Sequence, residues 1–324
     1  MPGAIGSMRP AISRNELAWL ATLDDVESRI VFTERHDDKC RYRVETGPFE
    51  PEFLQALPKR DWTLLVHDVE KHLPSMRRLL QQVPFIPDWR IDDLMISFAA
   101  PGGGVGPHLD NYDVFLCQGI GSREWRFTTG HVEADPSASD DLALLQEFSH
   151  GDACLAQKGD VLYLPPGVPH WGTAKRACLT YSIGMRAPDF YRDPDLQPGE
   201  VRPGYISPQA RGRAGSSAEL LGKTVTELKP WLQPDTPDAS EIGAMLATPS
   251  ARRRLRLHGM TRIAYDDEHV YVNGAARTLE DAERSPVAAL CDHRRLNQDT
   301  ATGLGDGCLQ WLMEQGAFEQ ADRE

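Results

Sequence analysis

The chain has 324 residues, of which 40% are hydrophobic and 26% are charged, and its formal net charge at pH 7 is -13. This length accommodates a full-sized core domain with one or two smaller units, and no stretch approaches the roughly 20 apolar residues that a membrane span requires. The acidic balance disfavours nucleic-acid binding through the bulk surface, because phosphate contacts need clustered basic residues.

Six cysteines are scattered along the chain without a Cys-x-x-Cys pair. This spacing argues against a zinc ribbon and against a disulfide framework. The first residues also lack the charged and apolar regions of a secretory signal. We therefore expect reduced thiols and a cytoplasmic protein.

The first part of the chain, to about residue 95, mixes short helical and strand-like pieces. Glu52 to Leu57 and His67 to Gln82 carry apolar residues at helical spacing, which predicts two helices. Trp62 to Val66 predicts a short buried strand between them.

From Leu94 to Arg186 the pattern changes to short β-prone runs separated by Gly and Pro turns. Closely spaced strands of this kind are typical of a β-sandwich or a β-barrel. The predicted strands are Leu94 to Phe98, Val114 to Cys117, Glu124 to Phe127, Val161 to Leu164 and Leu179 to Met185.

The last third of the chain begins with a stretch rich in Pro, Gly and Arg, at about residues 187–215, which is typical of a linker. Ala218 to Leu232 predicts a helix. Another helix candidate follows from residue 241, and His269 to Val272 then leads into an Asn273–Gly274 turn, a strong hairpin signal. Helix, hairpin and a polar helical tail together indicate a small winged-helix-like module.

One group of residues carries metal chemistry. His108 and Asp110 are two residues apart, so on a strand both side chains would project from the same face. Gly159 begins a turn that feeds a buried strand, and the Pro165–Gly167 corner then presents His170. Two histidines and one carboxylate form the facial triad of non-heme Fe(II) oxygenases, which leaves open coordination positions.

Arg123 follows the Gly119–Gly121 turn in the same strand-rich block. A buried guanidinium would pair bidentately with the far carboxylate of a dicarboxylic acid. Taken alone, His-x-Asp arises often by chance, His170 could be an ordinary loop histidine, and Arg123 could form a surface ion pair. Their order within one strand-rich block favours a metal centre.

Four segments resemble the bacterial JmjC-type ribosomal oxygenases, a cupin family whose typical activity is arginine 3-hydroxylation of large-subunit ribosomal protein sixteen. They are Phe85 to Ser97, Pro101 to Asp110, Asn111 to Phe115 and Tyr181 to Pro188. The resemblance covers most of residues 20–190 and, more loosely, the remainder. It implies a mainly β fold with helices, in which a double-stranded β-helix precedes a helical dimerisation segment and the winged-helix-like domain.

The resemblance also implies domain boundaries and site residues. The domains would be a catalytic JmjC/cupin domain at 1–190, a linker with the dimerisation helix at 191–240, and the winged-helix-like domain at 241–324. Iron(II) would be bound by His108, Asp110 and His170. The cosubstrates would be O₂ and 2-oxoglutarate, the latter anchored by Arg123 with further contacts from Thr180 and Ser182.

The expected partner is a ribosomal protein, with a homodimer formed through Ala218 to Leu232. Tyr112 and Asp113 follow the metal-binding segment and could line the mouth of the site, where an acidic group would suit an arginine; Asp113 could equally cap a turn. Residues 241–324 contain ten Lys and Arg against fourteen Asp and Glu. That balance predicts no direct nucleic-acid binding by the last module.

Three other functions remain open from the sequence. The enzyme could hydroxylate a histidine of another ribosomal protein, or it could demethylate lysine, although no aromatic-cage segment supports demethylation. A metal-binding cupin without oxidative chemistry is the non-enzymatic alternative. Such a scaffold has no need of a dicarboxylate anchor at Arg123.

Overall fold

The structure is a computed structural model that describes residues 1–5, 11–36, 39–82, 86–128, 144–145, 148, 151–186, 202–208, 210, 217–247 and 255–320. The chain divides into two compact units. Unit 1 comprises Met1–Gln82 and Asp92–Ala187, and unit 2 comprises Val83–Ile91 and Pro188–Glu324. The three-part division given above stays a prediction.

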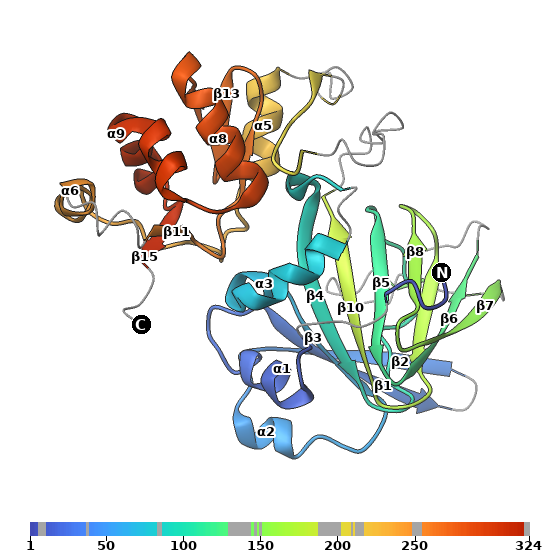
Figure 1. Cartoon of the computed structure of the whole chain (residues 1–324). Coiled ribbons are helices and arrows are strands. Elements are labelled where there is room, and N and C mark those ends of the chain that lie inside the picture. Colours follow the sequence, from blue (N-terminus) through green and yellow to red (C-terminus); the bar gives the residue numbers. More distant parts are fainter. Residues whose placement is uncertain are drawn as a thin grey trace. The chain divides into compact units, whose positions relative to one another are not determined.

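Unit 1 is built on two antiparallel sheets (Figure 1). The larger sheet has the strand order β2-β1-β3-β4-β10-β5-β8, and the smaller has the order β7-β6-β9. Their bounds are β1 Ser28–His36, β2 Lys39–Thr46, β3 Trp62–Val66, β4 Ile91–Ala99, β5 Val114–Ile120, β6 Ser122–Phe127, β7 Asp152–Gln157, β8 Val161–Leu164, β9 His170–Ala174 and β10 Cys178–Met185. The predicted mainly β architecture is confirmed.

The inner faces of the two sheets pack on each other. Leu116 of β5 and Trp125 of β6 belong to one buried cluster, together with Val114, Ala156 and Leu164. Ala99 of β4, Ala174 of β9 and Cys178 of β10 form a second cluster of small residues. Because directly opposed residues of an antiparallel pair share a face, these clusters identify which side chains point inward.

Short helices accompany the strands of unit 1. They are α1 (Arg14–Leu20), α2 (Pro51–Gln55), α3 (Val69–His72) and the 3-10 helix η1 (Pro74–Gln82). Ser13 caps α1, and Glu16 completes the capping box. The predicted single helix from His67 to Gln82 is wrong. Asp68 has a left-handed backbone, and Pro74 lacks the N–H that a continuous α-helix needs.

Unit 2 combines helices with two small sheets. It contains η2 (Asp88–Arg90), α5 (Ala218–Thr226), α6 (Ala239–Ala247), α8 (Asp281–His293), α9 (Gln298–Glu314), the antiparallel sheet β12 (Ile263–Tyr265), β13 (His269–Val272) and β14 (Ala275–Thr278), and the pair β11 (Leu255–Leu257) and β15 (Phe318–Gln320). The predicted Asn273–Gly274 hairpin is confirmed, with positive φ at both residues.

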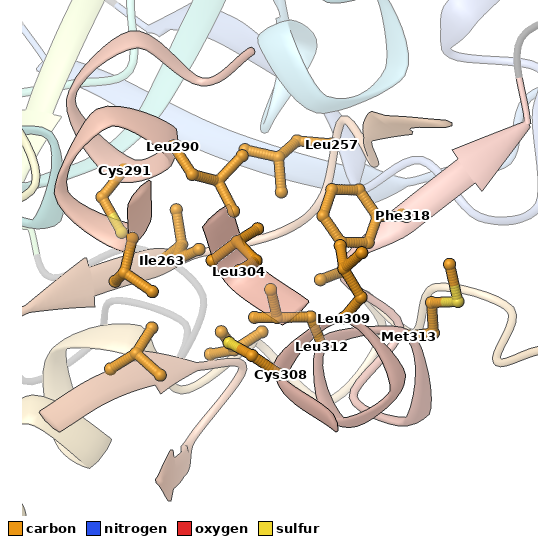
Figure 2. Close-up of a cluster of buried hydrophobic side chains, with 14 of the residues drawn as sticks. Leu257, Ile263, Leu290, Cys291, Leu304, Cys308, Leu309, Leu312, Met313 and Phe318 are labelled. Atoms are coloured by element: carbon orange, nitrogen blue, oxygen red, sulfur yellow. The ribbon is translucent and has the colours of Figure 1, made fainter. Parts of the chain in front are cut away.

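The core of unit 2 lies between α8, α9 and the small strands (Figure 2). Leu304, Leu309 and Leu312 of α9 are fully buried in it, and so is Leu290 of α8. The helix predicted from Ala218 to Leu232 ends at Thr226. These elements are compatible with a winged-helix-like module, which stays a prediction. Among the described residues, no helix is both long and apolar enough to cross a bilayer.

Candidate active site

Two antiparallel backbone hydrogen bonds hold His108 beside His170. The amide of His108 donates to the carbonyl of His170 at 3.0 Å, and the reverse bond measures 2.8 Å. His108 lies in an isolated bridge, and Asp110 lies outside any strand, so the strand predicted for this segment is wrong. Pro107 has no N–H to donate, and Gly106 has φ +87°, which prevents a regular ladder here.

The three predicted metal ligands nevertheless converge. One ligand atom from each of His108, Asp110 and His170 lies within 4.8 Å of the other two. The Nε2 atom of His108 is 4.0 Å from one carboxylate oxygen of Asp110, and the Nε2 atom of His170 is 3.7 Å from the other. Two imidazoles and a carboxylate in this arrangement offer three ligands to one ion.

Backbone carbonyls fix the proton positions of both imidazoles. The Nδ1 atom of His108 is 3.0 Å from the carbonyl of Gly106, and that of His170 is 2.9 Å from the carbonyl of Val168. A carbonyl can only accept, so each Nδ1 carries the proton and each Nε2 presents its lone pair to the shared centre.

The electrostatics of His170 agree with a ligand role. Burial, together with the neighbouring His108, lowers the pKa of His170 to about 4. His170 is therefore neutral near pH 7, which is the form that binds a metal. The residues present fit a divalent ion of the iron type.

Arg123 lies on the inner face of β6, where only 4% of its surface is exposed. The β6–β9 register pairs Arg123 with Ala174 and Phe127 with His170. Arg123 and His170 therefore share a face and are separated by four residue pairs, about 13 Å along the strands. An arginine side chain and a five-carbon dicarboxylate can span that distance together.

Within the described part of the chain, neither Nε nor Nη2 of Arg123 has a hydrogen-bond partner. A buried guanidinium left without acceptors is costly, and a carboxylate is the acceptor that satisfies it best. The guanidinium carbon lies 5.3 Å from the ring centroid of Trp125, which supports it from the side. This geometry fits the far carboxylate of 2-oxoglutarate.

Thr180 and Ser182 also point inward. In the β10–β5 register they lie opposite Gln118 and Leu116, and Leu116 packs in the cluster that contains Trp125. Both are almost fully buried. The structure thus places them on the same inner surface as Arg123, and their contact with a cosubstrate stays a prediction.

Tyr112 and Asp113 lie in different surroundings. Burial and the nearby charges of Asp110 and Asp93 raise the pKa of Tyr112 above its usual value, so its hydroxyl is neutral beside the metal ligands. The carboxylate of Asp113 accepts a hydrogen bond from Tyr163 at 2.6 Å. Asp113 therefore already has a structural partner.

Asp93 on β4 was missed by the sequence analysis. A Cβ added to Gly184 would lie 3.1 Å from the Oδ1 atom of Asp93 and 3.8 Å from the ring of Tyr112, so these groups gather over Gly184 on the inner face. The adjacent pair Asp92–Asp93 at the start of a mostly apolar strand was a weak signal, because the sequence does not say which of the two carboxylates faces inward.

Comparison with known proteins agrees with this geometry. Residues 78–192 match the JmjC domain family. The chain is 33% identical to ribosomal protein uL16 3-hydroxylase of Escherichia coli K12, covering 91% of this chain and 84% of the relative. It is also 33% identical to a probable ribosomal oxygenase of Haemophilus influenzae, over 68% of this chain and 56% of the relative.

Solved structures of a ribosomal oxygenase are also similar to this chain. An X-ray structure of E. coli YcfD matches with a TM-score of 0.75 at 30% identity, covering 95% of this chain and 90% of that chain. A structure of YcfD in complex with cobalt and 2-oxoglutarate matches with a TM-score of 0.69 at 30% identity and the same coverage.

Proposed function

The chain belongs to the family of JmjC-domain ribosomal oxygenases, and on that premise we propose that it is an Fe(II)- and 2-oxoglutarate-dependent dioxygenase that hydroxylates an arginine of ribosomal protein uL16. The observation that carries the proposal is the presence, beside the His108–Asp110–His170 cluster, of the buried Arg123 guanidinium, whose Nε and Nη2 atoms have no hydrogen-bond partner among the described residues. A metal site alone would not require that guanidinium.

In the proposed site, His108, Asp110 and His170 hold the metal through two neutral nitrogens and one carboxylate. Bound iron, together with 2-oxoglutarate and O₂, supplies the oxidising chemistry that converts a C–H group to C–OH. Arg123 binds the far carboxylate of 2-oxoglutarate and so fixes the orientation of its keto-acid end. Thr180 and Ser182 offer polar contacts on the same inner surface. The protein thereby contributes positioning rather than a general base.

The substrate side of the site is proposed to lie at Asp93 and Tyr112. The Asp93 carboxylate can accept a charge-assisted hydrogen bond from a guanidinium, and the Tyr112 ring can pack along an aliphatic stem. Both lie over Gly184 near Asp110. This arrangement favours arginine over histidine or methyl-lysine, because a guanidinium is always charged and offers several N–H donors to a carboxylate.

Two further assignments are proposals. We infer a homodimer that uses the segment from Ala218 to Leu232, since Leu220 and Trp231 expose 57% and 49% of their surfaces. We infer a cytoplasmic location, supported by the six free cysteines. The acidic charge of residues 241–324 supports a structural or protein-binding role for the last module.

An anaerobic titration with Fe(II) and 2-oxoglutarate tests the cofactor assignment. We expect the visible absorption of an iron-bound keto acid in the wild type and its loss in His108→Ala. Metal binding without that absorption would favour the non-oxidative cupin.

A further inference from the structure

His67 connects two charged side chains beside the proposed substrate pocket. The Nη2 atom of Arg29 lies 3.1 Å from the Nε2 atom of His67, and the Nδ1 atom of His67 lies 3.1 Å from the Oδ2 atom of Asp93. The side chains of His67 and Asp93 are 15% and 10% exposed. The three groups therefore form a chain whose geometry is protected from solvent.

The hydrogen-bonding roles of Arg29 and Asp93 determine which ring nitrogen of His67 carries the proton. A guanidinium can only donate, so the Nε2 atom of His67 must accept and cannot carry a proton. The proton then resides on Nδ1 and is donated to Asp93. His67 is a neutral bridge between a cation and an anion.

The sheet register explains why His67 lies between Arg29 and Asp93. Arg29 of β1 pairs with Leu65 of β3, and Leu65 pairs with Ser97 of β4, so all three residues share a face. Asp93 lies four residues before Ser97 and points to the same inner side. Arg29 and Asp93 therefore face the same space across β3, with His67 between them.

Two cations on this side of the sheet contact other groups. Lys71 contacts Asp68 and donates to the carbonyl of Asp92, and Arg186 pairs with the carboxylate of Asp92 at 3.0 Å. Without the His67 ring, the Arg29 guanidinium and the Asp93 carboxylate would face each other across the space that the ring occupies.

We propose that His67 is a positioning residue that aims the Asp93 carboxylate at the substrate and keeps Arg29 from neutralising it. The inference rests on the proposed function, in which Asp93 recognises an arginine guanidinium. His67 donates to Oδ2, while Oδ1 stays over Gly184 beside Tyr112. Selectivity for a cationic side chain then depends on a residue that never touches the substrate.

The test compares kcat/KM for two uL16 peptides. One contains the unmodified target arginine, and the other contains citrulline, a neutral analogue, at the same position. We expect His67→Ala to reduce the preference for arginine about tenfold, because Arg29 can then pair with Asp93. His67→Gln should retain the preference within about threefold, since one amide can accept from Arg29 and donate to Asp93. The double variant Arg29→Met, His67→Ala should recover much of what His67→Ala loses.

A matched control is His269→Ala in unit 2, another histidine beside an aspartate, Asp266, at 3.6 Å. It should leave the preference unchanged. An equal loss for both peptides in His67→Ala, or a His67→Gln variant as impaired as His67→Ala, would overturn the inference and indicate a structural role.

Nitrogen-15 NMR of the His67 imidazole separates this inference from the proposed function. We expect a protonated Nδ1 and an unprotonated Nε2 whatever the substrate is. A doubly protonated ring, or a proton on Nε2, overturns the bridge. Absence of wild-type turnover on uL16, with the expected tautomer present, would instead overturn the proposed function.

Discussion

Asp110 provides the one carboxylate of the three-residue metal cluster, between the Nε2 atoms of two histidines. Replacing it by alanine removes a ligand from a partly exposed, polar pocket. We expect Asp110→Ala to abolish succinate formation while the melting temperature changes little. The control is Asp25→Ala, whose carboxylate is 63% exposed and lies 3.8 Å from His72. Unchanged succinate formation in Asp110→Ala would contradict the ligand assignment.

Arg123 and Arg126 lie on opposite faces of β6. Arg126 pairs with Glu124 and is 36% exposed, whereas Arg123 is buried. Arg123→Met should raise the KM for 2-oxoglutarate about 10- to 100-fold, because a hydrogen-bonded ionic contact is lost. Metal affinity, measured by calorimetry with Mn(II), should remain. Arg126→Met should change neither, and equal effects of the two variants would place the anchor elsewhere.

At the scale of elements, the sequence predicted strands best where they are apolar on both faces. β3 and β8 were predicted with their observed bounds, because each is an apolar run too short for a helix and β8 is bounded by glycine and proline turns. β1, β2, β7 and β9 were not predicted. The polar–apolar alternation of β2 (Lys39–Thr46) was a usable signal that the prediction overlooked. In contrast, β7 alternates weakly and β9 contains a glycine, so their pairing with β6 depends on contacts between distant residues that no local pattern reports.

For the metal site, as for the strands, the sequence predicted some features and not others. Spacing and resemblance predicted the cluster of His108, Asp110 and His170, although His108 lies in an isolated bridge and Asp110 lies outside any strand. Asp93 could not be predicted as a site residue, because its position depends on the pairing of β4 with its neighbours. Its contact with His67 likewise joins residues 26 positions apart.

The start of α8 offers a test of electrostatic stabilisation in unit 2. Arg277 of β14 donates two hydrogen bonds to Glu283, at 2.6 and 2.8 Å, and Glu283 also accepts from the Glu280 amide. The Arg277 guanidinium, with that amide, lowers the pKa of Glu283. Glu283→Gln should cost about 1–3 kcal/mol of the free energy of unfolding at pH 7.

The sign of the pH dependence follows from the lowered pKa. The contribution of Glu283 is present above the unfolded-state pKa of about 4.3 and is lost as the pH falls below it. Urea unfolding of wild type and Glu283→Gln should therefore converge as the pH falls below about 4. Asp281→Asn, whose side chain is 96% exposed, is the control and should change stability little. A difference that did not shrink in acid would contradict this account of the ion pair.

At the scale of the whole molecule, the inferred homodimer depends on exposed apolar side chains of unit 2. Leu221 and Val225 of α5 are buried within unit 2, whereas Leu220 points outward. Changing Leu220 and Trp231 to glutamate should shift sedimentation from dimer to monomer at micromolar concentration, because burying two carboxylates in an apolar contact is costly. A wild type that sediments as a monomer would contradict the dimer.

We would incubate the enzyme with uL16, Fe(II), 2-oxoglutarate and O₂, and measure the mass and fragmentation of uL16. The account predicts the gain of one oxygen atom on an arginine, which requires 2-oxoglutarate and disappears in His108→Ala. Succinate formation with no oxygen added to uL16, or oxygen added to a histidine instead, would contradict it.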